Sequence, residues 1–142
     1  MSADVSRYVL DSFALLAFFQ GEPGGLRVRQ LLEQAMRGEA SLAMTTVNLG
    51  EVVYRTERRY GLERAEEVLA KIEEYPLQII GVDRDLTLAA AHLKARHRMG
   101  YVDCMAASLA QHLDATLVTG DADFRRVEGV VSVEWLVVGG EP

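Results

Sequence analysis

Four acidic residues, far apart in the sequence, stand beside apolar segments. Asp11 directly follows the stretch YVL, Asp121 follows TLVTG, and Glu51 and Asp103 have Val, Leu and Ala neighbours. If the fold brought these carboxylates to about 6 Å, each pair would repel by roughly 2 to 3 kcal/mol at an effective dielectric near 20. A cation would relieve that repulsion, and an all-oxygen ligand set selects Mg²⁺ or Mn²⁺, which bridge to phosphate groups. The four acids therefore indicate the chemistry of phosphodiester hydrolysis.

Each acid also has a purely structural interpretation when it is taken alone. Asp11 could cap the helix after it, and Asp103 lies in a first helical turn, where the macrodipole favours a carboxylate. Glu51 precedes Arg55 by four residues, which is the spacing of a surface ion pair. Asp121 could be a turn acid. The metal hypothesis therefore depends on the convergence of all four side chains.

The apolar pattern predicts strands alternating with helices, and the acids fall at or near the junctions. We expect strands at 8–10, 41–45, 77–82, 116–119 and within 130–138. We expect helices at 13–20, 26–37, 46–60 with Thr46 as N-cap, 63–75, 83–98 and 102–113, and a turn with a helical start at 121–126. This order predicts a three-layer α/β/α fold around a central parallel sheet of about five strands. Ligands bind such sheets at the carboxyl ends of the strands.

Composition restricts the class of protein. The 142 residues predict one domain spanning 1–142, and a hydrophobic content of 49% indicates a sizeable core. The longest apolar run, Phe13–Phe19, is much shorter than the roughly 20 residues of a membrane span. No secretory signal is visible, so we expect a cytoplasmic protein without membrane contact.

Charge and cysteine content narrow the function further. A net charge of −6 argues against passive binding to nucleic acid, although an enzyme can bind phosphate through a cation. The single Cys104 excludes an internal disulfide and is expected in the core. The three histidines lack the spacing of a zinc site.

Three segments carry a resemblance to a known family. In their order and spacing, VLDSFALLAFF, TTVNLGEVVYR and GYVDCMAASLAQHLDATLVTGDADF resemble the PIN-domain family, in particular the VapC-type toxins of prokaryotic toxin–antitoxin pairs. The resemblance spans about 8–135 and implies RNA cleavage with one or two Mg²⁺ or Mn²⁺ ions. The metal ligands and catalytic residues that it implies are Asp11, Glu51, Asp103 and Asp121. It implies supporting roles for Ser12, Asn48 and Thr119, and for Asp123 as an outer acid.

The resemblance also implies partners. These are an RNA substrate, a VapB-type antitoxin whose C-terminal segment covers the active site, and a second copy of the chain in a homodimer. Apolar residues such as Leu26, Leu62 and Leu69 could contact the antitoxin or pack in the core.

A cluster of arginines has two interpretations. Arg55, Arg58 and Arg59 could form a solvated face paired with neighbouring glutamates, or a rim that contacts RNA phosphates.

Other classes of function remain as alternatives. A phosphoacceptor receiver domain needs paired acids after the first strand and a Lys after the last, but Ser12 follows Asp11 and no Lys occurs beyond Lys94. A catalytically silent binding module would lack one of the four acids. A PIN-domain nuclease that acts on other RNA or on DNA, outside a toxin–antitoxin pair, stays open.

Overall fold

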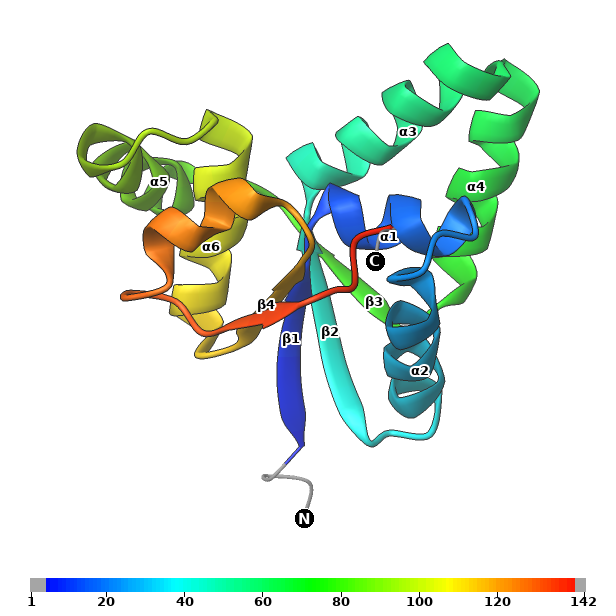
Figure 1. Cartoon of the computed structure of the whole chain (residues 1–142), viewed down its shortest axis with the longest axis horizontal. Helices are drawn as coiled ribbons and strands as arrows, with labels where there is room; N and C mark the ends of the chain where they lie inside the picture. The colour runs from blue at the N-terminus through cyan, green and yellow to red at the C-terminus, as the bar shows by residue number, and fades with distance from the viewer. Residues whose placement is uncertain (1–4, 140–142) are drawn as a thin grey trace.

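The structure is a computed structural model and describes residues 5–139 (Figure 1). The strands are β1 (Ser6–Leu10), β2 (Ala40–Thr45), β3 (Leu77–Ile80), β4 (Thr116–Thr119) and β5 (Val133–Trp135). The helices are α1 (Ser12–Phe19), α2 (Gly25–Met36), α3 (Thr46–Tyr60), α4 (Leu62–Glu74), α5 (Arg84–Arg96), α6 (Tyr101–Leu113) and the 3₁₀ helix η1 (Ala122–Val127). The predicted order of strands and helices is confirmed.

All five strands form one parallel sheet in the order β3-β2-β1-β4-β5. The chain first builds outward from β1 to β2 and β3, and then returns to place β4 and β5 on the opposite side of β1. Strand order therefore reverses between β1 and β4. Ligands of open parallel sheets bind at the carboxyl edge beside such a reversal.

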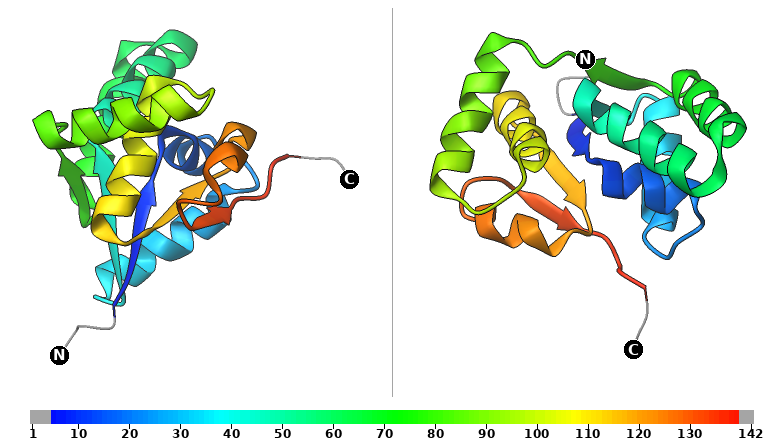
Figure 2. Two further views of the ribbon diagram at one scale, coloured as in Figure 1. Left: turned by 90° about the vertical axis from the view of Figure 1, so that its left-hand side faces the viewer. Right: turned by 90° about the horizontal axis from the view of Figure 1, so that it is seen from above.

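Helices cover both faces of the sheet, with α5 and α6 on one face and α1 to α4 on the other (Figure 2). Successive strand residues point to opposite faces, so Val9 packs under α6 while Leu10 packs under α1 and α2. Cys104 is buried in the core beneath α6, as predicted. The three-layer α/β/α fold is confirmed.

Some boundaries differ from those predicted. Thr45, not Thr46, is the N-cap of α3, because its extended backbone lets its hydroxyl accept a hydrogen bond from the Asn48 amide. Helix α5 ends at Arg96, and the last strand contains only Val133–Trp135. Between residues 5 and 139, no helix has both the length and the apolar character needed to cross a membrane.

Candidate active site

Asp11 lies where β1 ends and α1 begins. Its Oδ1 accepts a hydrogen bond from the Ala14 amide at 2.9 Å, so the predicted helix cap is present. Its Oδ2 accepts a second hydrogen bond from the Thr119 hydroxyl at 2.5 Å, and the residue is only 2% exposed. A simple cap would lie in solvent, whereas this carboxylate is buried and tied to the neighbouring strand β4.

Thr119 connects Asp11 to the turn after β4. Its Oγ1 also accepts a hydrogen bond from the Asp121 amide at 3.0 Å. Asp121 in turn caps η1, because its Oδ1 accepts from the Asp123 amide at 2.9 Å. The ends of β1 and β4 are thus joined through one buried hydroxyl group at the reversal of strand order.

Glu51 reaches the same region from the second turn of α3. Its Oε1 accepts hydrogen bonds from the Ser12 hydroxyl at 2.8 Å and from the Asn48 amide group at 3.4 Å. The Thr45 hydroxyl donates to Asn48 Oδ1 at 2.7 Å and so orients that amide. The predicted ion pair with Arg55 is also present, with 3.7 Å between Arg55 Nη2 and Glu51 Oε2. The Glu51 side chain is therefore ion-paired with Arg55 and also fixed by hydrogen bonds near the start of α3.

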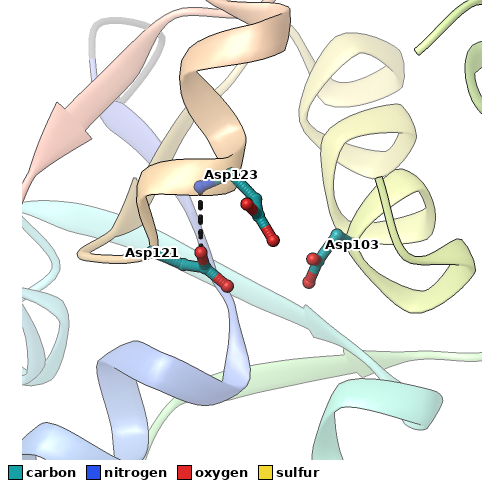
Figure 3. A group of neighbouring side chains, drawn as sticks. All are labelled: Asp103, Asp121 and Asp123. Carbon is teal, nitrogen blue, oxygen red and sulfur yellow. Dashed lines mark hydrogen bonds between the residues drawn. The ribbon is translucent and has the colours of Figure 1, made fainter. Parts of the chain in front are cut away.

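Three carboxylates form a compact group at this edge of the sheet. Asp103, in the first turn of α6, faces Asp121 and Asp123, and one oxygen of each lies within 4.8 Å of the others (Figure 3). Sequence reasoning placed Asp123 outside the metal ligands. The tight turn of η1 returns its side chain beside Asp121, and the two-residue spacing of these acids was the available signal.

The acids share one cleft of about 400 Å³. Its lining comes from α1, α3, α6 and η1, and from the residues that precede α1, α6 and η1. The lining residues are Asp11, Ser12, Phe13, Glu51, Arg55, Gly100, Tyr101, Val102, Asp103, Asp121 and Asp123. The four acids singled out in the sequence therefore converge, and the structure adds Asp123 to them.

Crowding and burial change the protonation of two carboxyl groups. Burial raises the pKa of Asp11 to about 7; the hydrogen bonds from Thr119 and Ala14 oppose this change, and the charges of Asp103 and Asp121 add to it. Burial followed by the charge of Asp121 raises the pKa of Asp103 to about 6, with Arg55 acting in the opposite direction. A cation bound in the cleft would therefore compete with protons for these two carboxyl groups.

The donor set fits a hard divalent cation. Asp103, Asp121 and Asp123 offer carboxylate oxygens at mutually short range, and Asp11 and Glu51 line the same cleft. Oxygen ligands suit Mg²⁺ or Mn²⁺, and a positive charge would offset the burial and the repulsion that raise the two pKa values.

The three arginines of the predicted rim lie differently. Arg55 lines the cleft, and the Arg58 guanidinium lies 5.3 Å from the Tyr54 ring centroid. Arg59 donates to Gln20 Oε1 at 3.3 Å, at the end of α1. Within residues 5–139, neither Arg58 nor Arg59 forms an ion pair with the neighbouring glutamates.

The fold and the site together define the class: a three-layer α/β/α protein with an acidic cleft at the strand-order reversal of a parallel sheet. Comparison with protein-family profiles matches residues 8–130 to the PIN domain. The chain belongs to the PIN domain family.

Solved structures share this fold. A chain of the VapBC2 complex of Rickettsia felis, bound to a promoter DNA fragment, superposes with a TM-score of 0.72 at 22% identity, covering 92% of this chain and 99% of the other. A chain of DNA-bound VapBC from Salmonella typhimurium gives 0.70 at 18% identity, with coverage of 92% and 98%. VapC20 of Mycobacterium tuberculosis, described as a sarcin–ricin loop cleaving toxin, gives 0.66 at 20% identity, with coverage of 84% and 93%. A search of curated proteins finds no match.

Proposed function

We propose that this PIN-domain protein is an endoribonuclease that depends on Mg²⁺ or Mn²⁺ and acts as the toxin of a VapBC-type pair. The observation that supports this most strongly is the convergence of five acids in one cleft, at the edge where parallel sheets bind ligands. Similarity in fold to VapC20 and to the VapBC complexes supports the choice of RNA as substrate and of an antitoxin as partner.

In this proposal the chain's own residues prepare a cation site. Asp103, Asp121 and Asp123 would hold the ion, with Asp11 and Glu51 completing its ligands directly or through water. Thr119 positions Asp11 through its hydroxyl group, and Ser12 and Asn48 position Glu51. When bound, such an ion lowers the pKa of a water ligand and offsets charge on the phosphate during hydrolysis.

The proposed protein partners would also use surfaces outside the cleft. Leu26 on α2 and Leu62 on α4 are exposed, and a groove between these helices is lined partly by Leu32, Met36 and Tyr75. Apolar side chains of this kind suit an antitoxin segment or a second copy of the chain. Leu69 is only partly accessible. Sedimentation of the purified chain, alone and with its antitoxin, would test the proposed homodimer.

The function is tested by cleavage of transfer RNA and of a ribosomal stem-loop, with Mg²⁺, with Mn²⁺ and with EDTA. We expect cleavage with either ion, none with EDTA, and a loss of at least 100-fold in Asp103→Asn, because one ligand of the ion is removed. Asp85→Asn is the matched control: Asp85 also lies in a first helical turn, that of α5, but outside the cleft. Full activity of Asp103→Asn would contradict the assignment.

The same assay, together with growth on expression, distinguishes the proposed toxin from the alternative function. Cleavage of single-stranded DNA at the rate of RNA would favour a PIN-domain nuclease outside a toxin–antitoxin pair. Growth arrest on expression, relieved by a short neighbouring gene for a DNA-binding protein, would favour the toxin.

A further inference from the structure

We infer that Tyr54 and Arg58 form a platform on α3, beside the acidic cleft, that stacks with an unpaired base of the RNA substrate. This inference rests on the proposed ribonuclease function and names residues that would bind the substrate. It assigns a role to an exposed aromatic residue, Tyr54, that lies outside the acidic cleft.

The platform continues the face of α3 that begins in the cleft. Glu51, Tyr54, Arg55 and Arg58 occupy positions i, i+3, i+4 and i+7 and therefore share one side of the helix. Glu51 and Arg55 line the cleft, so Tyr54 and Arg58 continue this stripe beyond its rim. Figure 1 shows α3 running outward from the carboxyl ends of the strands, as a strand of RNA leaving the cleft along this helix would have to run.

The two side chains offer a surface suited to one nucleotide. The Arg58 guanidinium lies 5.3 Å from the Tyr54 ring centroid, and the Tyr54 residue is 44% exposed. Arg58 takes part in no ion pair with any residue from 5 to 139, so its charge remains available. Aromatic rings and guanidinium planes stack with unpaired bases, and a guanidinium also contacts phosphate.

A second tyrosine lies on the opposite wall. Tyr101, at the start of α6, lines the cleft and is 38% exposed. Its hydroxyl donates to the Thr87 carbonyl of α5 at 3.4 Å, which orients the ring. Aromatic groups therefore flank the acids on both sides. Bases inside an A-form duplex are stacked on one another and cannot use these surfaces, whereas bases of a loop can.

The chain contains a matched control on the same helix. Tyr60 and Arg59 repeat the pair, with 5.2 Å between the guanidinium and the ring centroid and 50% exposure of Tyr60. Tyr60 is nine residues from Glu51, which places it on the far side of α3 at 100° per residue. Arg59 is directed to Gln20 of α1. The same pair of residue types therefore also occurs away from the helix side that carries Glu51 and Tyr54.

The experiment measures fluorescence anisotropy of a labelled, unstructured 12-nucleotide RNA and of a 12-base-pair RNA duplex. Ca²⁺ replaces Mg²⁺, because it fills oxygen sites and preserves the charge balance of the cleft. The full-length wild type is compared with Tyr54→Ala, Tyr54→Phe and Tyr60→Ala, and the circular dichroism of each variant is recorded. Cleavage of a stem-loop RNA with Mg²⁺ or Mn²⁺ is measured in parallel.

We expect Tyr54→Ala to weaken binding of unstructured RNA about tenfold, the typical effect of one lost stacking contact. Duplex binding should change less than twofold, Tyr54→Phe should bind as the wild type does, and Tyr60→Ala should have no effect. In cleavage, KM should rise in Tyr54→Ala while kcat is retained.

Three results would overturn the inference in distinguishable ways. If the wild type cleaves RNA but Tyr54→Ala binds the unstructured strand as tightly as Tyr60→Ala does, the platform is wrong and the ribonuclease function stands. Equal losses for strand and duplex in Tyr54→Ala would likewise contradict recognition of an unpaired base. If the wild type cleaves no RNA with either ion, both proposals are wrong.

Discussion

Asp11 combines two requirements in one side chain. Its Oδ1 caps α1, and its Oδ2 is bound by Thr119 from the adjacent strand, in a setting that is 2% exposed. Burial without a counter-charge makes the ionised form costly, which is the main cause of its raised pKa of about 7. The site is therefore poised to exchange a proton for a cation.

The raised pKa predicts how stability depends on pH. Between about pH 4 and 7, the folded chain retains the Asp11 proton and the unfolded chain loses it, so the free energy of unfolding falls as pH rises. In EDTA, we expect ionisation of Asp11 to lower the free energy of unfolding by roughly 2 kcal/mol between pH 5.5 and pH 8. Asn caps helices as well as Asp does, so Asp11→Asn should be more stable than the wild type at pH 8 by about 1 to 3 kcal/mol and should cleave no RNA.

Urea unfolding at pH 5.5, 7 and 8 measures this effect, with Asp85→Asn as the control for loss of a negative charge. The Asp85→Asn profile should run parallel to the wild type, whereas the Asp11→Asn profile should be flatter. Parallel profiles for wild type and Asp11→Asn would contradict the assigned cause.

At the scale of elements, the turn between β4 and η1 determines the shape of the acidic group. Gly120 lies between the buried Thr119 and the cleft acid Asp121, and a Cβ at this position would overlap the Phe13 ring on α1. A glycine is thus needed here for the close approach of two elements, since a side chain would push them apart.

Gly120→Ala should therefore destabilise the protein by about 1 to 3 kcal/mol and lower cleavage, because the displaced turn moves Asp121 relative to Asp103. The matched control is Gly50→Ala, within α3, where a Cβ meets nothing within 4 Å. That change should stabilise the protein by roughly 0.5 to 1 kcal/mol, the helix preference for Ala over Gly. Thermal unfolding and cleavage rates test both.

A double variant tests the cause. Adding Phe13→Leu should recover part of the activity and stability of Gly120→Ala, because the smaller side chain makes room for the new methyl group. If the double variant loses as much stability and activity as the two single variants lose together, the contact with the Phe13 ring is not the cause.

At the scale of the whole molecule, the two cores on opposite faces of the sheet bring the acids together. α1 and α3 pack on one face and α6 on the other, so the cleft receives side chains from both layers where the strands end. Repulsion between these charges lowers the free energy of unfolding of the whole domain, because elements of both layers meet at the cleft. A cation should therefore stabilise the protein globally and should not merely order a loop.

We expect Mg²⁺ or Mn²⁺ at millimolar concentration to raise the Tm, and to raise it more at pH 8 than at pH 6. Protons compete with the ion for Asp11 and Asp103, whose pKa values are about 7 and about 6. Scanning calorimetry with NaCl at equal ionic strength as the control measures this. An equal increase at both pH values, or an equal increase in Asp103→Asn, would place the ion elsewhere.

Much of this protein follows from the sequence alone. Alternating apolar segments with Gly and Pro between them are sufficient for the order of strands and helices, because hydrophobic periodicity is a local property. The same segments indicated a parallel sheet with helices on both faces, and the acids after 8–10 and 116–119 indicated its functional edge. Residue types do not decide the exact helix boundaries: Thr45 and Thr46 are both suitable caps, and only the extended backbone at Thr45 selects between them.

Tertiary structure alone decided how the acids are arranged. The order β3-β2-β1-β4-β5 makes β1 and β4 neighbours, so that Thr119 reaches Asp11 across 108 positions of sequence. The turn of η1 brings Asp123 beside Asp121, and the helical phase of α3 places Arg58 on the cleft side and directs Arg59 to α1. The physical reason is that hydrogen bonds, burial and charge repulsion between distant residues depend on distances in space, which residue types and spacing do not specify.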